Sequence, residues 1–297
     1  MKNKKAMVMT VREALRTGTE MLKSANIEAP AVDAGVILCH ILKCSNVYLY
    51  AHDDKVLSEV EARNFLKSIE NRMEGMPVAY IIGHREFMSL DFKVTPFVLI
   101  PRPETEILVE TVISYARQMQ AGNSNGYRHI NILDIGTGSG CIAISLAYYL
   151  GDCRVTAVDI SDKALEIAMD NACANGVKNK IIFIKSDCFS NIDESGLFHV
   201  IVSNPPYISV QDMDCLQEEV KKYEPVSALN GGIDGLDFYR RIISDAPQYL
   251  HSNGMLAFEV GYNQAEKVSH LMEEHFNSIR KIRDLSGIYR VVTGIKM

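Results

Sequence analysis

The sequence predicts an α/β fold, in which a largely parallel sheet is covered by helices on both faces, preceded by a small helical domain. From Thr10 to about Gly83, apolar residues recur three and four positions apart, which is the helical period. After residue 104, short apolar runs alternate with helical stretches, which indicates parallel strands joined by helices. The chain has 297 residues, enough for one large domain and one small one.

The helical part begins and ends its helices with recognisable signals. Thr10 with Glu13, and Ser58 with Glu61, fit capping boxes, and Gly75 suits the end of the second helix that they open. Two apolar stripes indicate that several short helices share a core. The stripes contain Val11, Ala14, Leu15, Met21 and Leu22, and Val36, Ile37, Leu38, Ile41 and Leu42.

The boundary between the two parts is marked by a hairpin pattern and prolines. Residues 86–95 alternate like a short hairpin, and Pro96, Pro101 and Pro103 then interrupt any regular element. We therefore expect a helical domain, a hairpin with a proline-rich linker, and an α/β domain. Their bounds are 1–85, 86–103 and 104–297.

The α/β domain contains seven apolar runs of strand length after a helix at about 104–120. The runs lie at 130–135, 153–159, 180–185, 198–203, 254–260, 278–284 and 288–294. The turn Leu285-Ser286-Gly287 joins the last two, so we expect a mostly parallel seven-stranded sheet with an antiparallel hairpin at its edge.

Composition excludes several classes of protein. The net charge is -6 and the basic residues are dispersed, which argues against a phosphate-binding stripe and favours a protein or small-molecule substrate. No run of eighteen apolar residues occurs and the basic start does not lead into a signal-peptide core, so we expect a cytoplasmic protein without a membrane segment. Seven scattered cysteines show no zinc-ligand spacing, so we expect buried reduced thiols and no metal.

A glycine loop, Gly136-Thr137-Gly138-Ser139-Gly140, lies between the strand at 130–135 and a helix that begins at Cys141. Strand, glycine turn and helix start form a nucleotide-type site, because glycine lets the backbone turn sharply and approach a ligand. The alternative is a merely tight turn. A dinucleotide fingerprint needs its third glycine at position 141, which is a cysteine, so the loop resembles that of S-adenosylmethionine enzymes.

Two acids follow the next strands. Asp159 ends the strand at 153–159, where a carboxylate accepts hydrogen bonds from ribose hydroxyls. The alternative role for Asp159 is to cap the following helix, although Ser161 is equally suited to that. Asp187 follows the strand at 180–185 and is a candidate partner for an adenine amino group, or else an exposed loop aspartate.

The segment Asn204-Pro205-Pro206-Tyr207 follows the fourth strand and therefore reaches the same sheet edge as the glycine loop. Two prolines fix φ and remove two donors, so the Asn204 carboxamide and the Pro205 carbonyl can be presented as rigid acceptors. A planar amide or base nitrogen attacks a methyl group poorly unless such acceptors hold its hydrogens. We therefore predict catalytic roles for Asn204, Pro205 and Tyr207, the last as an aromatic wall, with no general base; the alternative is a plain proline turn.

With these motifs in this order, the chain resembles class I, Rossmann-like S-adenosylmethionine-dependent methyltransferases that modify planar nitrogens. The segment Leu99–Glu106 (LIPRPETE), preceded by Tyr80-Ile81-Ile82-Gly83, is similar to the HemK/PrmC family of release-factor glutamine N5-methyltransferases. The resemblance spans nearly the whole chain. It implies a helical N-terminal domain for partner recognition, a linking hairpin and a seven-stranded methyltransferase domain. It also implies S-adenosylmethionine as the cofactor, the glutamine of the Gly-Gly-Gln motif in class 1 peptide release factors as substrate, and a role in translation termination.

The resemblance also implies which residues bind. The cofactor set is Gly136, Thr137, Gly138, Ser139, Gly140, Asp159, Asp187, Cys188 and Asn204. The substrate set is Asn204, Pro205, Pro206 and Tyr207, with Arg102 and Glu104 at the entrance or at the partner. The alternative for these two is an exposed arginine and a glutamate at a helix N-terminus. Many family members carry an aromatic residue at the position of Cys188, so the neighbouring Phe189 is the candidate to stack on adenine instead.

Three other functions remain open from the residues. A nucleic-acid exocyclic-amine methyltransferase, acting on adenine N6 or guanine N2, would use the same chemistry, but the basic groove it needs is missing from the composition. A nonenzymatic cofactor-sensing module would use the helical domain as its interaction surface. The spacing of the glycines argues against a nicotinamide dehydrogenase. We expect a monomer that does not contact nucleic acid.

Overall fold

A computed structural model describes residues 9–122, 129–193 and 196–297 as two compact units. One unit contains the described chain up to Gly83 together with Gln217–Tyr223. The other contains His84–Leu216 and Glu224–Met297. The chain therefore leaves the larger unit once, at Leu216, and returns to it at Glu224.

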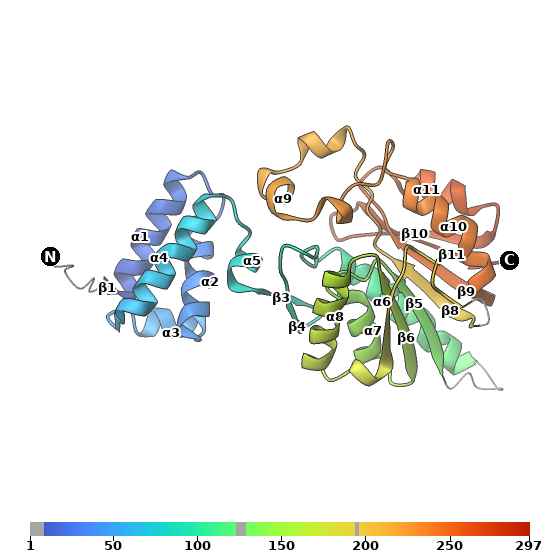
Figure 1. Cartoon of the computed structure of the whole chain (residues 1–297), viewed down its shortest axis with the longest axis horizontal. Helices are drawn as coiled ribbons and strands as arrows, with labels where there is room; N and C mark the ends of the chain where they lie inside the picture. The colour runs from blue at the N-terminus through green and yellow to red at the C-terminus, as the bar shows by residue number, and fades with distance from the viewer. Residues whose placement is uncertain (1–8, 123–128, 194–195) are drawn as a thin grey trace. The chain divides into compact units, whose positions relative to one another are not determined.

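The smaller unit is a helical bundle (Figure 1). Both capping boxes are present, since the Thr10 and Ser58 side chains accept from the backbone amides of Glu13 and Glu61. Gly75 follows the fourth helix with φ of 91°. Residues of both apolar stripes meet in one core. The elements are β1 (Met9–Thr10), α1 (Val11–Ser24), α2 (Pro30–Leu42), α3 (Asn46–Ala51), β2 (Val56–Leu57), α4 (Glu59–Met73), α5 (Val78–Ile82) and the later α9 (Glu218–Tyr223).

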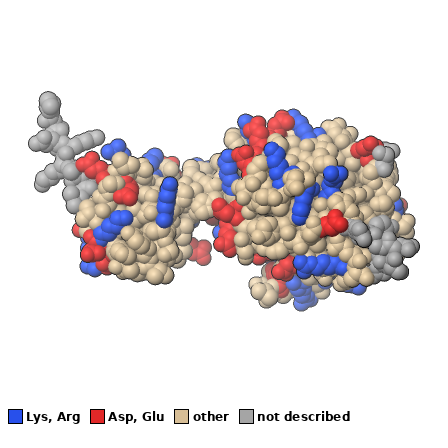
Figure 2. Space-filling model, turned by 90° about the horizontal axis from the view of Figure 1, so that it is seen from below, with Lys and Arg blue, Asp and Glu red and all other residues tan. Residues whose placement is uncertain are grey.

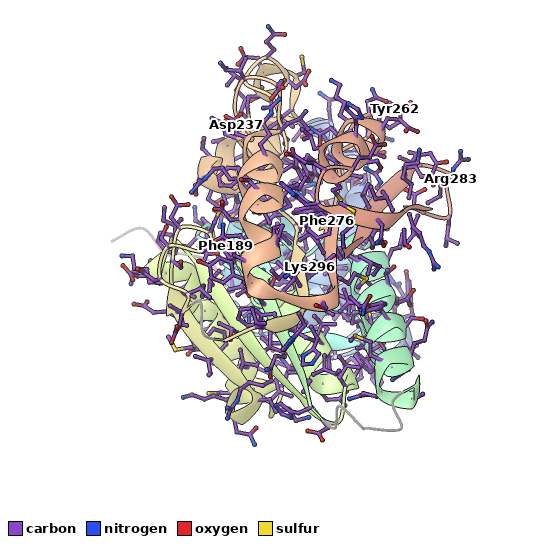
Figure 3. The ribbon with its side chains drawn as sticks, turned by 90° about the vertical axis from the view of Figure 1, so that its right-hand side faces the viewer. Phe189, Asp237, Tyr262, Phe276, Arg283 and Lys296 are labelled. Carbon is purple, nitrogen blue, oxygen red and sulfur yellow. The ribbon has the colours of Figure 1, made fainter. Side chains whose placement is uncertain are left out.

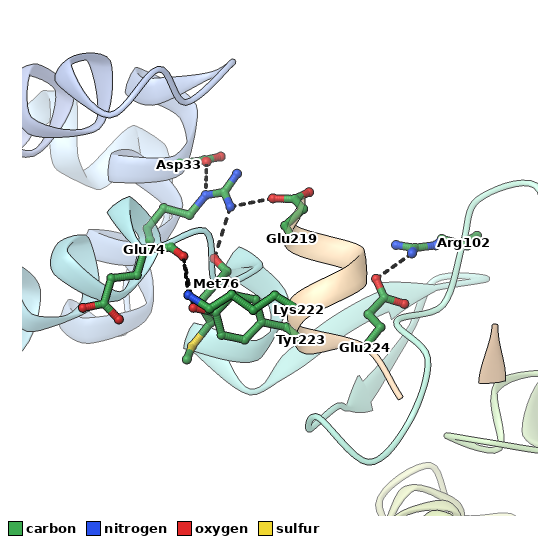
Figure 4. Close-up of polar contacts among 9 residues, drawn as sticks. Asp33, Glu74, Met76, Arg102, Glu219, Lys222, Tyr223 and Glu224 are labelled. Atoms are coloured by element: carbon green, nitrogen blue, oxygen red, sulfur yellow. Dashed lines mark hydrogen bonds and ion pairs between the residues drawn. The ribbon is translucent and has the colours of Figure 1, made fainter. Parts of the chain in front are cut away.

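Helix α9 packs in the helical unit although the sequence places it well inside the range 104–297. The guanidinium of Arg72 lies 2.6 Å from the Glu219 carboxylate (Figure 4). Lys222 Nζ and Tyr223 Oη each donate to the Glu74 carbonyl at 3.1 Å. These bonds fix both ends of a helix of only six residues, which is too short to be stable by itself.

The larger unit contains a seven-stranded sheet in the order β10-β11-β9-β8-β5-β6-β7 (Figure 1). Strand β11 runs antiparallel to both of its neighbours, and the other adjacent pairs are parallel. The predicted fold class, including the edge hairpin, is confirmed. The strands are β5 (Ile130–Ile135), β6 (Cys153–Asp159), β7 (Ile181–Lys185), β8 (Phe198–Ser203), β9 (Leu250–Glu259), β10 (Phe276–Arg283) and β11 (Tyr289–Lys296).

Helices cover both faces of this sheet. Within β5, Ile130 and Ile132 pack on the side of α6 and α7, while Leu133 and Ile135 pack on the side of α10. Helix α10, with Asp237 in its first turn, lies over the sheet (Figure 3). The helices are α6 (Thr105–Gly122), α7 (Cys141–Tyr149), α8 (Asp162–Ala174), α10 (Asp237–Tyr249) and α11 (Ala265–Met272), with 3-10 turns η1 (Lys178–Lys180), η2 (Asp212–Cys215) and η3 (Val226–Ala228).

Several predicted segments differ in extent from the structure, most of them by one or two residues. The expected hairpin at 86–95 is β3 (His84–Phe87) with β4 (Leu90–Lys93), slightly earlier in the chain. Strand β9 begins at Leu250, which pairs with Phe198, and not at 254. The polar residues 251–253 conceal this start in the sequence, because they lie on a partly exposed end of the strand.

The cysteines are free thiols, as expected, but two of them are exposed. Cys153 and Cys188 are buried, Cys39, Cys44 and Cys141 are partly buried, and Cys173 and Cys215 face solvent. The expectation of burial is therefore confirmed for the first two and wrong for the two exposed cysteines. Cys173 lies on the outer side of α8 and Cys215 in the turn η2. Within the described ranges, no group of three potential metal ligands occurs and no helix is long and apolar enough to cross a membrane.

Candidate active site

One cavity of the larger unit, about 550 Å³, opens at the carboxyl ends of the parallel strands, where α/β proteins bind ligands. We call it the glycine-loop cavity. The predicted site residues that line it are Arg102, Gly136, Thr137, Gly138, Ser139, Asp159, Asp187, Cys188, Asn204, Pro205 and Pro206. The structure thus brings together segments that are separated by more than a hundred residues in the sequence.

The glycine loop needs its glycines for two different reasons. Gly136 and Gly138 have φ of 75° and 55°, and an added Cβ at either would meet no atom within 4 Å. Their backbone therefore borders open space that a ligand can approach closely. At Gly140, with φ of 82°, a Cβ would lie 2.8 Å from Ile144 Cδ1 and 3.1 Å from Ala168 Cβ, so this glycine lets the start of α7 pack closely on α8.

Asp159 stabilises the glycine loop by hydrogen bonding. Its Oδ2 accepts from the Gly138 amide and its Oδ1 from the Ser161 amide, both at 2.9 Å. Burial raises the pKa of this carboxyl. The cap of α8 is Ser161, whose side chain accepts from the Ala164 amide, so Asp159 is left to face the cavity.

A second acid under the loop, Asp134, escaped the sequence analysis. The Thr137 hydroxyl donates to its Oδ2 at 2.7 Å, and burial, assisted by the nearby Asp159 charge, raises its pKa to about 7. Asp134 is fully buried within β5. A lone aspartate inside an apolar strand is itself the signal that could have identified it, because isolated acids are rarely buried.

The end of β7 supplies Asp187 and Cys188. Asp187 Oδ1 lies 2.9 Å from the Arg241 guanidinium, and Cys188 is buried with φ of 51°. Burial raises the pKa of the Cys188 thiol to about 11. Phe189, labelled in Figure 3, belongs to the core, where its ring stacks on Tyr249 with centroids 4.5 Å apart. Phe189 is not among the described residues lining the cavity, so it does not provide the aromatic surface beside Cys188.

Asn204, Pro205 and Pro206 line the same cavity, whereas Tyr207 lies behind them. The Tyr207 ring packs so closely on Gly261 that a Cβ there would lie 3.0 Å from Cδ2, and burial raises the pKa of its hydroxyl to about 12. The Tyr207 carbonyl accepts from Gln264 Nε2 at 2.8 Å.

Gln264 holds this loop from the side of β9. Its Nε2 also donates to the Gly235 carbonyl at 3.1 Å, and its Oε1 accepts from the Gly261 amide at 3.0 Å. Gln264 was not predicted from the sequence, since a glutamine near a helix start carries no distinctive signal.

A polar chain connects Asn204 to a buried acid. Asn204 Nδ2 donates to Thr105 Oγ1 at 3.3 Å, and Thr105 Oγ1 donates to Glu259 Oε2 at 2.5 Å. Thr105 and Glu259 are both buried, and burial raises the pKa of Glu259 to about 7. Neither residue was predicted, although Glu259, like Asp134, is a lone acid inside an apolar run.

The proline-rich segment contributes Arg102 but not Glu104 to the cavity. The Arg102 guanidinium lies 2.6 Å from Glu224, whose side chain is 1% exposed (Figure 4). Glu104 lines a separate cavity between α6 and the β10–β11 hairpin. The two candidates from one segment are therefore not brought to the same site.

Solved structures share this fold. A methyltransferase from Pyrococcus furiosus has 19% sequence identity and a TM-score of 0.50, covering 78% of this chain and 98% of that one. The catalytic domain of hMettl16, in complex with the MAT2A 3′UTR hairpin 6, has 16% identity and a TM-score of 0.53, covering 81% and 84%. At such low identity the likeness concerns the fold alone.

Sequence relatives are much closer. The family model of the PrmC N-terminal domain matches residues 13–83, and that of the methyltransferase small domain matches 115–222. A release factor glutamine methyltransferase from Thermodesulfovibrio yellowstonii is 41% identical over 88% of this chain and 90% of that protein. Proteins of the same name from Koribacter versatilis and Clostridium botulinum are 38% and 37% identical over 97% of this chain and 99% and 100% of theirs. Identity of this level over nearly the full length shows that the chain belongs to the release factor glutamine methyltransferase family.

Proposed function

We propose that this protein transfers a methyl group from S-adenosylmethionine to the side-chain nitrogen N5 of the glutamine in the Gly-Gly-Gln motif of class 1 peptide release factors, and so modulates translation termination. The observation that carries the proposal is that Asn204, Pro205 and Pro206 share one cavity with the glycine loop. The names of the relatives supply the choice of a protein glutamine among the possible planar nitrogens.

The residues present fit the cofactor. Gly136 and Gly138 leave open space above their backbone, so the loop can receive the amino acid part of the cofactor closely. Asp159 would accept from the ribose hydroxyls, and Asp187 and Cys188 would border the adenine. When bound, S-adenosylmethionine supplies a methyl group on a positively charged sulfur.

The substrate amide would meet two acceptors. Asn204 Oδ1 and the Pro205 carbonyl can hold the two hydrogens of the glutamine nitrogen, which aims its lone pair at the methyl group and stabilises the positive charge that develops there. The surplus proton can leave afterwards to water, so no base is needed. Tyr207 would support the loop from behind, and Arg102 would border the entrance.

Charge distinguishes this proposal from methylation of nucleic acid. Acidic and basic side chains are interspersed over the face shown in Figure 2, and the chain carries a net charge of -6. A nucleic-acid enzyme gains most of its affinity from clustered Lys and Arg. We accordingly propose that the partner is a protein, and that the helical unit helps to recognise it. We also propose that the enzyme is a monomer and acts in the cytoplasm.

The test is methyl transfer from labelled S-adenosylmethionine to purified release factors. We expect labelling of the wild-type release factor and none after the glutamine of its Gly-Gly-Gln motif is changed to alanine. Equal labelling of the altered release factor would overturn the proposal. Labelled DNA or ribosomal RNA in parallel reactions would support the nucleic-acid alternative instead.

Variants of Asn204 test the chemistry. Asn204→Ala should abolish turnover while binding of S-adenosylmethionine, measured by calorimetry, is largely preserved. Asn204→Asp keeps the shape and an acceptor oxygen but places a charge beside Thr105, and we expect it to be strongly impaired as well. Full activity of Asn204→Ala would contradict the role of the carboxamide.

A further inference from the structure

Asn204 can serve as an acceptor only if its carboxamide has one of two orientations. The group carries an oxygen on one side and an NH₂ on the other, and the two have nearly the same shape. With the NH₂ toward the substrate, two donors would face each other and the methyl-accepting nitrogen would lose its contact. Correct chemistry therefore needs something that distinguishes the two orientations.

The contacts behind Asn204 make that distinction. The hydroxyl of Thr105 has a single proton, and its 2.5 Å contact with Glu259 Oε2 uses it, because two bare oxygens would repel each other at that distance. The Thr105 oxygen can then only accept from its other neighbour. That neighbour, 3.3 Å away, is the Asn204 side chain, which must present Nδ2.

We propose that Glu259, acting through the Thr105 hydroxyl, fixes the orientation of the Asn204 carboxamide so that its oxygen faces the nitrogen to be methylated. Both are positioning residues, since they touch Asn204 and not the reacting atoms. The inference rests on the proposed function for the identity of the substrate nitrogen, whereas the orientation of Asn204 is a property of the protein alone.

Burial explains why the Thr105–Glu259 contact allows only one orientation of Asn204. Thr105 is 2% exposed and Glu259 is 3% exposed, so water does not compete for their hydrogen bonds. An acid this deeply buried is retained at a free-energy penalty, which is expected at a functional site and not in a core optimised for stability alone.

The ionisation of Glu259 should therefore control the acceptor. Protonated Glu259 can donate to Thr105, which frees the Thr105 proton for Asn204 and removes the preference between the two orientations. Since the pKa of Glu259 is raised to about 7, its carboxylate is lost as the pH falls through that value. The ionisable groups that act on Glu259 or feel its charge are Glu104, Arg290, Tyr207, Tyr239 and Cys141; Glu104 raises its pKa and Arg290 lowers it.

Turnover of four variants tests the proposal. Thr105→Val replaces the hydroxyl by a methyl group of the same shape, and we expect kcat to fall by about 100-fold, the penalty of a misplaced catalytic group, with little change in KM or in S-adenosylmethionine affinity. Thr105→Ser keeps the hydroxyl and should recover most of the rate. Glu259→Gln should lower kcat and abolish the decline in rate of the wild type between pH 8 and pH 6. Thr293→Val, a buried threonine on β11 outside the glycine-loop cavity, is the matched control and should keep the wild-type kcat.

A second measurement does not depend on turnover. The Asn204 Nδ2 protons, followed by ¹⁵N NMR, should exchange slowly with solvent in the wild type and Thr105→Ser, and rapidly in Thr105→Val. Wild-type kcat in Thr105→Val, or a Thr105→Ser as slow as Thr105→Val, would overturn the positioning role. If the wild type transfers no methyl group to release factors, the proposed function fails, and the exchange rates still decide whether Thr105 orients Asn204.

Discussion

The ion pair between Arg102 and Glu224 should be strongly asymmetric in its response to mutation. Glu224 is almost completely buried, with 1% of its side chain exposed, whereas 34% of the Arg102 side chain is exposed. Arg102→Met removes the guanidinium that lies against a buried carboxylate. Glu224→Gln leaves a guanidinium that water can still reach.

The magnitudes follow from this difference in burial. Removing one partner of a buried pair destabilises a protein by about 3–5 kcal/mol, and we expect about 3 kcal/mol for Arg102→Met because Arg102 admits some solvent to the pair. Glu224→Gln keeps the shape and one acceptor for Arg102, so the expected loss is about 1 kcal/mol. Combining both changes replaces the pair by neutral groups, and the double variant should be more stable than Arg102→Met by about 1–2 kcal/mol.

Urea unfolding followed by circular dichroism measures these differences for the three variants and the wild type at one pH. The chain contains no tryptophan, so fluorescence offers only its tyrosines. Equal destabilisation by Arg102→Met and Glu224→Gln, or strict additivity in the double variant, would refute the reasoning. Midpoints of unfolding are compared only between variants whose unfolding free energy has the same slope against urea concentration.

Three further predictions concern the site. Gly138→Ala places a side chain on a residue with φ of 55°, so we expect the affinity for S-adenosylmethionine, measured by calorimetry, to fall at least roughly tenfold. An undiminished affinity would contradict this. Gln264→Ala removes the hydrogen bond to the Tyr207 carbonyl, so we expect kcat to fall and the free energy of unfolding to drop by about 1–3 kcal/mol, seen as a lower melting temperature. An unchanged kcat would show that the Asn204–Tyr207 loop keeps its conformation without Gln264. Asp134 has its pKa raised from 3.8 to about 7, so its contribution to stability is fully present below about pH 4 and is lost as the pH rises through 7. Asp134→Asn should make the unfolding free energy depend less on pH over that window, and an unaltered pH dependence would contradict it.

Much of the fold follows from local patterns in the sequence. Capping boxes at Thr10 and Ser58 begin helices where they were predicted, because a cap involves only residues three positions apart. The strand Cys153–Asp159 has the predicted bounds, since an apolar run between turn residues is equally local. The meeting of the glycine loop with Asn204 could also be predicted, because the carboxyl ends of parallel strands share one edge of a sheet.

The sequence by itself determined the fold class, the glycine loop and the rigid acceptors at Asn204 and Pro205. Only the tertiary structure decided what supports them. Thr105 and Glu259 are 154 positions apart, and no periodicity relates the start of a helix to the end of a distant strand that it meets only after folding. Helix α9 lies with the helical unit because of side-chain bonds to Arg72 and Glu74, which a pattern of apolar residues does not record. Local propensity thus fixes the elements, whereas long-range polar contacts, made only once the chain has folded, fix the orientation of the groups that react.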